Sequence, residues 1–168
     1  MAIVATADAG LRATPRATIL QLRAPDLTTR ELEGEATRLV KDLTIPVLVS
    51  SRCDIALATG AAGVNLPERD IATEFARGLI RRALIGRSVH ALEAAVRAQI
   101  EGADFVIFGP VWESTTHPDV TPAGLIALHA VAGSVRIPVL AIGGVTEARI
   151  AECLAAGAAG YAAIRMFE

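Results

Sequence analysis

Aromatic side chains are scarce in this sequence, and so is excess charge. Phe, Tyr and Trp together make up 4% of the 168 residues, too few for a platform on which nucleic-acid bases stack. The net charge is −2, and the pair Arg81-Arg82 is the nearest approach to a basic run. No apolar run approaches the roughly 20 residues of a membrane span. Nucleic acid and membrane surfaces are therefore not expected as partners.

Cysteine is also rare. The two cysteines, Cys53 and Cys153, lie far apart and show neither the spacing of a metal site nor a disulfide framework. The amino terminus lacks the pattern of a secretory signal peptide. We therefore expect a cytoplasmic protein in which both thiols stay reduced.

Aliphatic residues dominate what is present, because hydrophobic residues make up 52% of the chain. Short apolar runs alternate with segments of helical periodicity, as in a chain of parallel strands buried on both faces. The pattern predicts a single α/β domain over residues 1–168, folded as a (β/α)₈ TIM barrel. The predicted strands are Ile3–Ala7, Thr18–Arg23, Pro46–Val49, Gly63–Asn65, Ala83–Gly86, Asp104–Phe108, Pro138–Ile142 and Gly160–Ile164.

The predicted barrel is reduced at both ends of the chain. The segment from Asp8 to Thr18 leaves no room for a full helix, and it contains Gly10 and Pro15. The sequence ends at Glu168, directly after the eighth strand, and is shorter than the usual barrel of about 200–250 residues. We expect the first and last helices to be short or missing. Either a second subunit covers the resulting apolar flank, which favours a homo-oligomer such as a dimer, or polar residues replace it.

Reactive residues of a barrel lie where strands end. His90 follows the fifth strand; its imidazole is a candidate acid and base, or else it caps the helix that begins at Ala91. His117 lies in a hydroxyl-rich loop, residues 113–119, which either closes over a substrate or is simply solvated. His129 lies within a helix and is assigned no function.

A second candidate site follows the seventh strand. Gly143 and Gly144 precede a helix start at Thr146, and loops in this position often bind phosphate through backbone N–H groups. Arg165, which closes the eighth strand, either adds a guanidinium to the same phosphate or is an exposed arginine.

Several segments, taken in order, resemble the thiamine phosphate synthase/TenI superfamily over nearly the whole chain. They are Gln21–Arg23, Arg52–Leu57, Gly86–His90, Asp104–Trp112, Ile137–Thr146 and Gly157–Gly160. The resemblance implies a barrel enzyme of thiamine biosynthesis that acts on small phosphorylated heterocycles.

The synthase branch of this superfamily fits less well at two positions. Its second strand carries Gln-Leu-Arg-Glu-Lys-Asp, with the lysine on pyrophosphate, whereas Pro25 stands at that place here. It has Asn-Asp-Arg after the third strand, with the aspartate on magnesium, whereas this chain has Ser50-Ser51-Arg52. Asp70 is a possible counterpart of the second magnesium aspartate, and His117 stands near a family lysine. Because a magnesium clamp on pyrophosphate needs anionic oxygen ligands, the lost carboxylate counts against the synthase.

The thiazole tautomerase branch carries Gly-Arg-Ser-Val-His, which this chain has in full at Gly86–His90. We therefore expect an isomerase that aromatises a carboxythiazole phosphate, with His90 moving the proton and no metal or cofactor. The resemblance implies phosphate binding by Gly143, Gly144 and Arg165, although the family commonly has serine at the last position. Arg23 or Arg52 would meet the ring carboxylate, and Ser88 and Glu113 would orient the substrate or His90.

Two alternatives stay open at this point. One is a magnesium-dependent thiamine phosphate synthase, which joins a pyrimidine to thiazole phosphate. The other is a homologue that binds a phosphorylated ligand but has lost catalysis.

Overall fold

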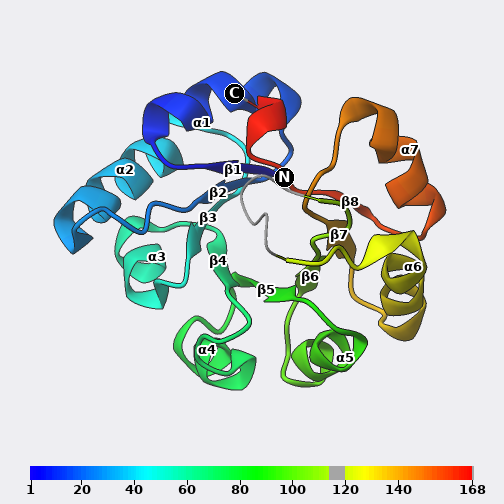
Figure 1. The fold of residues 1–168 in the computed structure, drawn as a ribbon. Coiled ribbons are helices and arrows are strands. Elements are labelled where there is room, and N and C mark those ends of the chain that lie inside the picture. Colours follow the sequence, from blue (N-terminus) through cyan, green and yellow to red (C-terminus); the bar gives the residue numbers. More distant parts are fainter. Residues whose placement is uncertain (114–119, 168) are drawn as a thin grey trace.

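Eight parallel strands form one sheet in this computed structural model, which describes residues 1–113 and 120–167. The strand order follows the sequence, so every strand lies next to its predecessor. A parallel bridge between Ala2 and Ala163 joins the first and last strands, so that the sheet closes into the predicted barrel (Figure 1). The strands are β1 (Ala2–Val4), β2 (Leu20–Leu22), β3 (Val47–Ser50), β4 (Gly63–Leu66), β5 (Leu84–Val89), β6 (Phe105–Phe108), β7 (Val139–Ala141) and β8 (Gly160–Tyr161).

Helices surround the strands, as Figure 1 shows. Within the described residues they are α1 (Ala7–Ala13), α2 (Thr29–Asp42), α3 (Cys53–Thr59), α4 (Thr73–Leu79), α5 (Leu92–Ile100), α6 (Gly124–Ser134) and α7 (Glu147–Ala155). The best-defined start is that of α2, where the Thr28 side chain and Glu31 form a reciprocal capping box. Among the residues that the structure describes, no helix is both long and apolar enough to cross a membrane.

The core has an inner and an outer layer, because successive side chains of each strand alternate between the two faces of the sheet. Inside the barrel, Ile3, Leu48, Phe105, Ile107 and Ala162 form one apolar cluster. Between the sheet and the helices lie two larger clusters, one over the first half of the barrel and one over the second. The inner cluster fills the barrel, and the polar inward-facing residues lie toward the carboxyl ends of the strands.

The first helix is short, as expected, but the glycine within it does not break it. Gly10 lies inside α1 because a larger residue would not fit: a Cβ there would lie 2.5 Å from Leu39 Cδ2 and 2.9 Å from Leu20 Cδ1. Pro15 lies in a 3-10 turn, Thr14–Arg16, that follows α1. Gly10 and Pro15 suggested a missing helix. Instead, Gly10 allows α1 to pack closely against its neighbours, and Pro15 lies in the turn where α1 ends.

After β8 the chain forms a 3-10 turn, Arg165–Phe167. Phe167 is 6% exposed, and its ring lies 6.2 Å from that of Tyr161. The expectation of an exposed apolar flank at this point is therefore wrong, because the Phe167 ring and α1 cover it. Large exposed apolar side chains lie elsewhere, for example Leu57, Phe75 and Leu79 on α3 and α4. The homo-oligomer stays a prediction.

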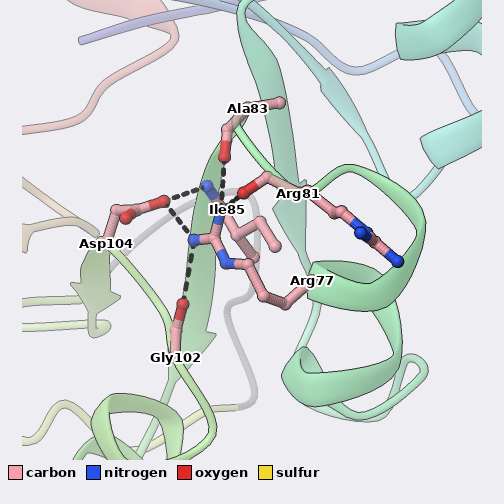
Figure 2. A network of polar contacts seen from close by, with 6 residues as sticks. All are labelled: Arg77, Arg81, Ala83, Ile85, Gly102 and Asp104. Atoms are coloured by element: carbon pink, nitrogen blue, oxygen red, sulfur yellow. Dashed lines mark hydrogen bonds and ion pairs between the residues drawn. The ribbon is translucent and has the colours of Figure 1, made fainter.

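Arg77 joins three segments at the amino-terminal end of the barrel (Figure 2). Its guanidinium donates to the carbonyls of Ala83 (2.7 Å) and Gly102 (2.9 Å) and pairs with the Asp104 carboxylate at 2.6 Å. Asp104 also accepts the Ile85 backbone N–H at 2.7 Å. This network connects α4 to the starts of β5 and β6, far from the end where strands present reactive residues.

Replacing Arg77 with alanine removes these charge-assisted bonds and leaves carbonyl groups without a donor. We expect Arg77→Ala to lower the free energy of unfolding by about 1.5–3 kcal/mol, the usual contribution of hydrogen bonds to a charged group. Urea denaturation measures this difference. The control is Arg81→Ala, because the Arg81 side chain points away from the network in Figure 2 and should change stability little. Equal losses for the two variants would contradict this role of Arg77.

Candidate active site

A cavity of about 710 Å³ opens at the carboxyl ends of the strands. The ends of parallel barrel strands all lie on one face of the molecule, so residues distant in sequence converge there. Seven of the eight predicted site residues line this cavity: Arg23, Ser88, His90, Glu113, Gly143, Gly144 and Arg165. Their individual roles remain predictions. His117, also considered as a site residue, lies outside the described residues.

Arg52 is the predicted site residue that does not line the cavity. Its Nε and a terminal nitrogen bind the two oxygens of Asp54 at 2.8 and 2.6 Å, and its other terminal nitrogen donates to Thr29 Oγ1 at 3.2 Å. The hydrogen bond from Arg52 lowers the pKa of Asp54 to about 2. Arg52 thus holds the start of α3 against the start of α2. Of the two arginines predicted to contact the substrate, Arg23 and Arg52, only Arg23 lines the cavity.

Gly143 and Gly144 form a turn that only glycine fits. Both have positive φ values, 88° and 65°, which side-chain-bearing residues rarely adopt. A Cβ on Gly144 would lie 2.5 Å from the Glu113 carbonyl oxygen and 2.7 Å from Trp112 Cβ. The preceding loop packs against this turn, and the Trp112 N–H donates to the Gly143 carbonyl at 3.1 Å. Backbone therefore borders the cavity directly in front of α7, as a phosphate site requires.

Arg149 was missed by the sequence reasoning and also lines the cavity. It lies in the first turn of α7 and donates back to the Gly144 carbonyl at 2.7 Å. Its guanidinium carbon also lies 4.9 Å from the centroid of the Trp112 ring, within the range of a cation–π contact. Arg149 therefore fixes the glycine turn and places a positive charge beside it. An arginine shortly after Gly-Gly-Val-Thr is the signal that could have identified it.

Glu68 is a second residue that sequence reasoning missed. Its carboxylate contacts Nδ1 of His90 at the cavity wall. The loop that carries Glu68 is held by Arg87, which is 8% exposed and donates to the carbonyls of Ile71, Glu68 and Asp70 at 2.5, 2.8 and 3.2 Å. Because Glu68 and His90 are 22 residues apart and lie on neighbouring strand ends, only the fold brings them together.

Two buried amides lie at the bottom of the cavity. Gln21 is 2% exposed and Asn65 is 3% exposed, and the Asn65 amide donates to Ser88 Oγ at 3.0 Å. Within the described part of the chain, Gln21 Oε1 and Asn65 Oδ1 are buried and accept no hydrogen bond. Leaving such an oxygen unsatisfied costs about 1–3 kcal/mol, so both suit a bound water or a ligand that carries N–H groups.

Fold and cavity together define a closed (β/α)₈ barrel with a polar cavity and a glycine turn at the carboxyl ends of its strands. The thiamine monophosphate synthase family model matches residues 2–167, and the chain belongs to this family. It is 40% identical to a thiamine-phosphate synthase of Chloroflexus aurantiacus over 153 residues, which cover 88% of this chain and 70% of the relative. It is 39% identical to a thiamine-phosphate synthase of Methanoculleus marisnigri over 161 residues, 93% of this chain and 76% of the relative.

A solved structure agrees with these matches. Thiamine phosphate pyrophosphorylase from Pyrococcus furiosus superposes with a TM-score of 0.88 at 31% identity, over 97% of this chain and 83% of that protein. The expectation of a thiazole tautomerase, an isomerase, is therefore wrong. That expectation rested on the motif Gly86–His90 and on the family lysine and aspartate that are missing at Pro25 and Ser51, whereas similarity to the synthases extends over almost the whole barrel.

Magnesium, which the resemblance implies for a synthase, finds a poor set of ligands here. No group of three His, Cys, Asp or Glu side chains in residues 1–113 and 120–167 could hold a metal ion. Ser51 follows β3, where the resemblance expects a carboxylate. Asp70 accepts the N–H of its neighbour Ile71 at 2.7 Å, and Glu68 contacts His90. The described residues do not fit a magnesium ion held by two carboxylates.

Adding a single methyl group to the glycine turn tests its function. We expect Gly144→Ala to weaken the binding of inorganic phosphate at least about tenfold, because its positive φ and the adjacent backbone both exclude a Cβ. Isothermal titration calorimetry measures this affinity. The control is Gly133→Ala in α6, where a Cβ meets no atom within 4 Å, and this variant should bind like wild type. Unchanged affinity in Gly144→Ala would show that phosphate binds elsewhere.

Proposed function

We propose that this chain is a thiamine-phosphate synthase, a transferase that joins a pyrimidine to thiazole phosphate. The observation that carries the proposal is the similarity to synthases over most of both chains, 88% of this one and 70% of the Chloroflexus enzyme. The cavity supports it, because it is lined by the Gly143–Gly144 turn, the buried amides of Gln21 and Asn65, and the imidazole of His90. Small phosphorylated heterocycles as substrates also suit the cytoplasmic location that the sequence predicts.

The reaction forms one bond and breaks one. The ring nitrogen of the thiazole supplies an electron pair to the pyrimidine carbon that bears the diphosphate. The carbon–oxygen bond breaks, and pyrophosphate leaves with that electron pair. No proton is gained or lost in this step. The protein therefore has to align the two rings and stabilise the charge that develops on the leaving group.

The residues of the cavity suit these two tasks. The backbone N–H groups of the Gly143–Gly144 turn, in front of α7, would bind the phosphate of the thiazole. The unsatisfied oxygens of Gln21 and Asn65 are acceptors for N–H groups of a heterocycle. His90, whose Nδ1 contacts Glu68, borders the same cavity on the β4–β5 side and is a candidate hydrogen-bond partner of the heterocycle. Ser88, bonded to Asn65, connects the amides to this part of the wall.

The test is product formation by the purified protein. With the pyrimidine diphosphate and thiazole phosphate as substrates, we expect thiamine phosphate and pyrophosphate in equal amounts, measured by fluorescence after oxidation and by a coupled pyrophosphate assay. Ser88→Ala should lower kcat at least about tenfold, which corresponds to a loss of roughly 1.4 kcal/mol of transition-state stabilisation. The control is Ser134→Ala, whose hydroxyl bonds within α6.

One outcome of this assay would contradict the proposed synthase function. If no thiamine phosphate forms, with or without added magnesium, while thiazole phosphate still binds, the chain is a binding protein that lacks synthase activity. Loss of activity in both serine variants would instead indicate damage to folding, which thermal unfolding of the two proteins would reveal.

A further inference from the structure

Three arginines line the cavity from neighbouring parts of the barrel. Arg23 follows β2, Arg165 follows β8, and Arg149 lies in the first turn of α7. The bridge between Ala2 and Ala163 places β8 next to β1, and β1 pairs with β2, so these arginines lie on neighbouring parts of the barrel. The Gly143–Gly144 turn lies on the same side, after β7, as the order of strands in Figure 1 shows.

The carboxylates of the cavity do not gather in the same way. Glu68 contacts His90 on the β4–β5 side. Glu147 binds Arg16 at 3.2 Å. Glu113 follows β6. These three residues come from three different segments, the loops after β4 and β6 and the start of α7, and Ser50 at the end of β3 also lines the cavity. A divalent ion that bridges to diphosphate needs oxygen ligands together at one place, and these carboxylates do not supply them.

We infer that this chain holds the diphosphate of its substrate, and the pyrophosphate that leaves, through Arg23, Arg149 and Arg165 without requiring a divalent cation. Guanidinium groups suit this role, because each stays charged and offers paired N–H donors that match two phosphate oxygens. The inference rests on the proposed function, since it concerns how the same cavity binds the diphosphate substrate.

The position of Arg149 strengthens this assignment. One of its nitrogens bonds the Gly144 carbonyl, and its guanidinium lies against Trp112, so the charge is already held in place before an anion arrives. A preorganised charge loses less side-chain entropy on binding than a free one does. Arg149 therefore acts on the anion directly and also positions the glycine turn.

Direct binding of inorganic pyrophosphate tests the inference. Titration calorimetry on the intact protein compares a buffer that contains EDTA with one that contains magnesium chloride. We expect the dissociation constant in EDTA to lie within about threefold of the value in magnesium. Arg165→Met should weaken binding in EDTA about tenfold to a hundredfold, as loss of a charge-assisted bond does. Arg97→Met, on α5 and outside the cavity lining, is the matched control and should bind like wild type.

A second variant restores the carboxylate that the chain lacks after β3. Ser51 has a φ of 66°, a conformation that aspartate tolerates better than most residues, so Ser51→Asp should fold. We expect this variant to bind pyrophosphate more weakly than wild type in EDTA and to gain affinity when magnesium is added. An equal response to magnesium in wild type and variant would overturn the inference.

The synthase assay separates this inference from the proposed function. Pyrophosphate binding in EDTA without any synthase activity would refute the proposed function and leave the arginine site in place. Activity and pyrophosphate binding that both require magnesium would support the synthase and overturn the inference. Product formation in EDTA at a rate similar to that in magnesium would support both.

Discussion

Closure of the sheet is the constraint on which the rest of the structure depends. The Ile3 N–H donates to the Ala163 carbonyl at 3.0 Å, and the Ala163 N–H donates to the Met1 carbonyl at 3.2 Å. These bonds place β8 beside β1, so that Arg165 after β8 and Arg23 after β2 follow strands only two positions apart. Without closure, the two arginines would belong to opposite edges of an open sheet. Because the strands are parallel, closure also brings the loops that follow them to one face, where the cavity lies.

Two groups of polar residues line opposite sides of the one cavity in the closed barrel. On the β4–β5 side, Glu68 contacts His90, and Asn65 bonds Ser88. On the side formed by β7, β8, β1 and β2 lie the glycine turn and the three arginines. A substrate with an anionic end and a heterocyclic end fits this arrangement, because each end meets groups of matching character. The opposite end of the barrel serves stability, through the network around Arg77 and Asp104.

The sequence predicted the fold well, because most strands are short apolar runs and helices such as α2 have one apolar face. It predicted less where long-range packing overrides a local preference. Gly10 and Pro15 read as helix breakers, yet Gly10 allows α1 to approach Leu39 and Leu20. The apolar flank expected after β8 is covered by Phe167, a residue beyond the last strand. Such contacts depend on where the chain returns in space, which periodicity does not reveal.

The candidate site, like the fold, was predicted where local sequence determines it and missed where long-range contacts do. Residues that end strands, such as His90 and Gly143, were found because their position along the chain implies their place in a barrel. Glu68 and Arg149 were missed because their partners are set by loop geometry. Arg52 was assigned to the substrate, although Asp54, two residues away, binds it. The branch of the family was misjudged for a related reason, since Gly86–His90, Pro25 and Ser51 are local features, whereas the similarity to synthases extends over most of the chain.

A titration of the ¹⁵N-labelled protein with thiazole phosphate, followed by the backbone amide resonances, shows most directly where the phosphate binds. We expect the largest changes on Gly143, Gly144 and the first turn of α7, with smaller changes at Ser88 and Asn65. Changes concentrated on the outer face of α2, around Arg30 and Arg38, would contradict this expectation, because the phosphate would then bind a charged surface outside the cavity.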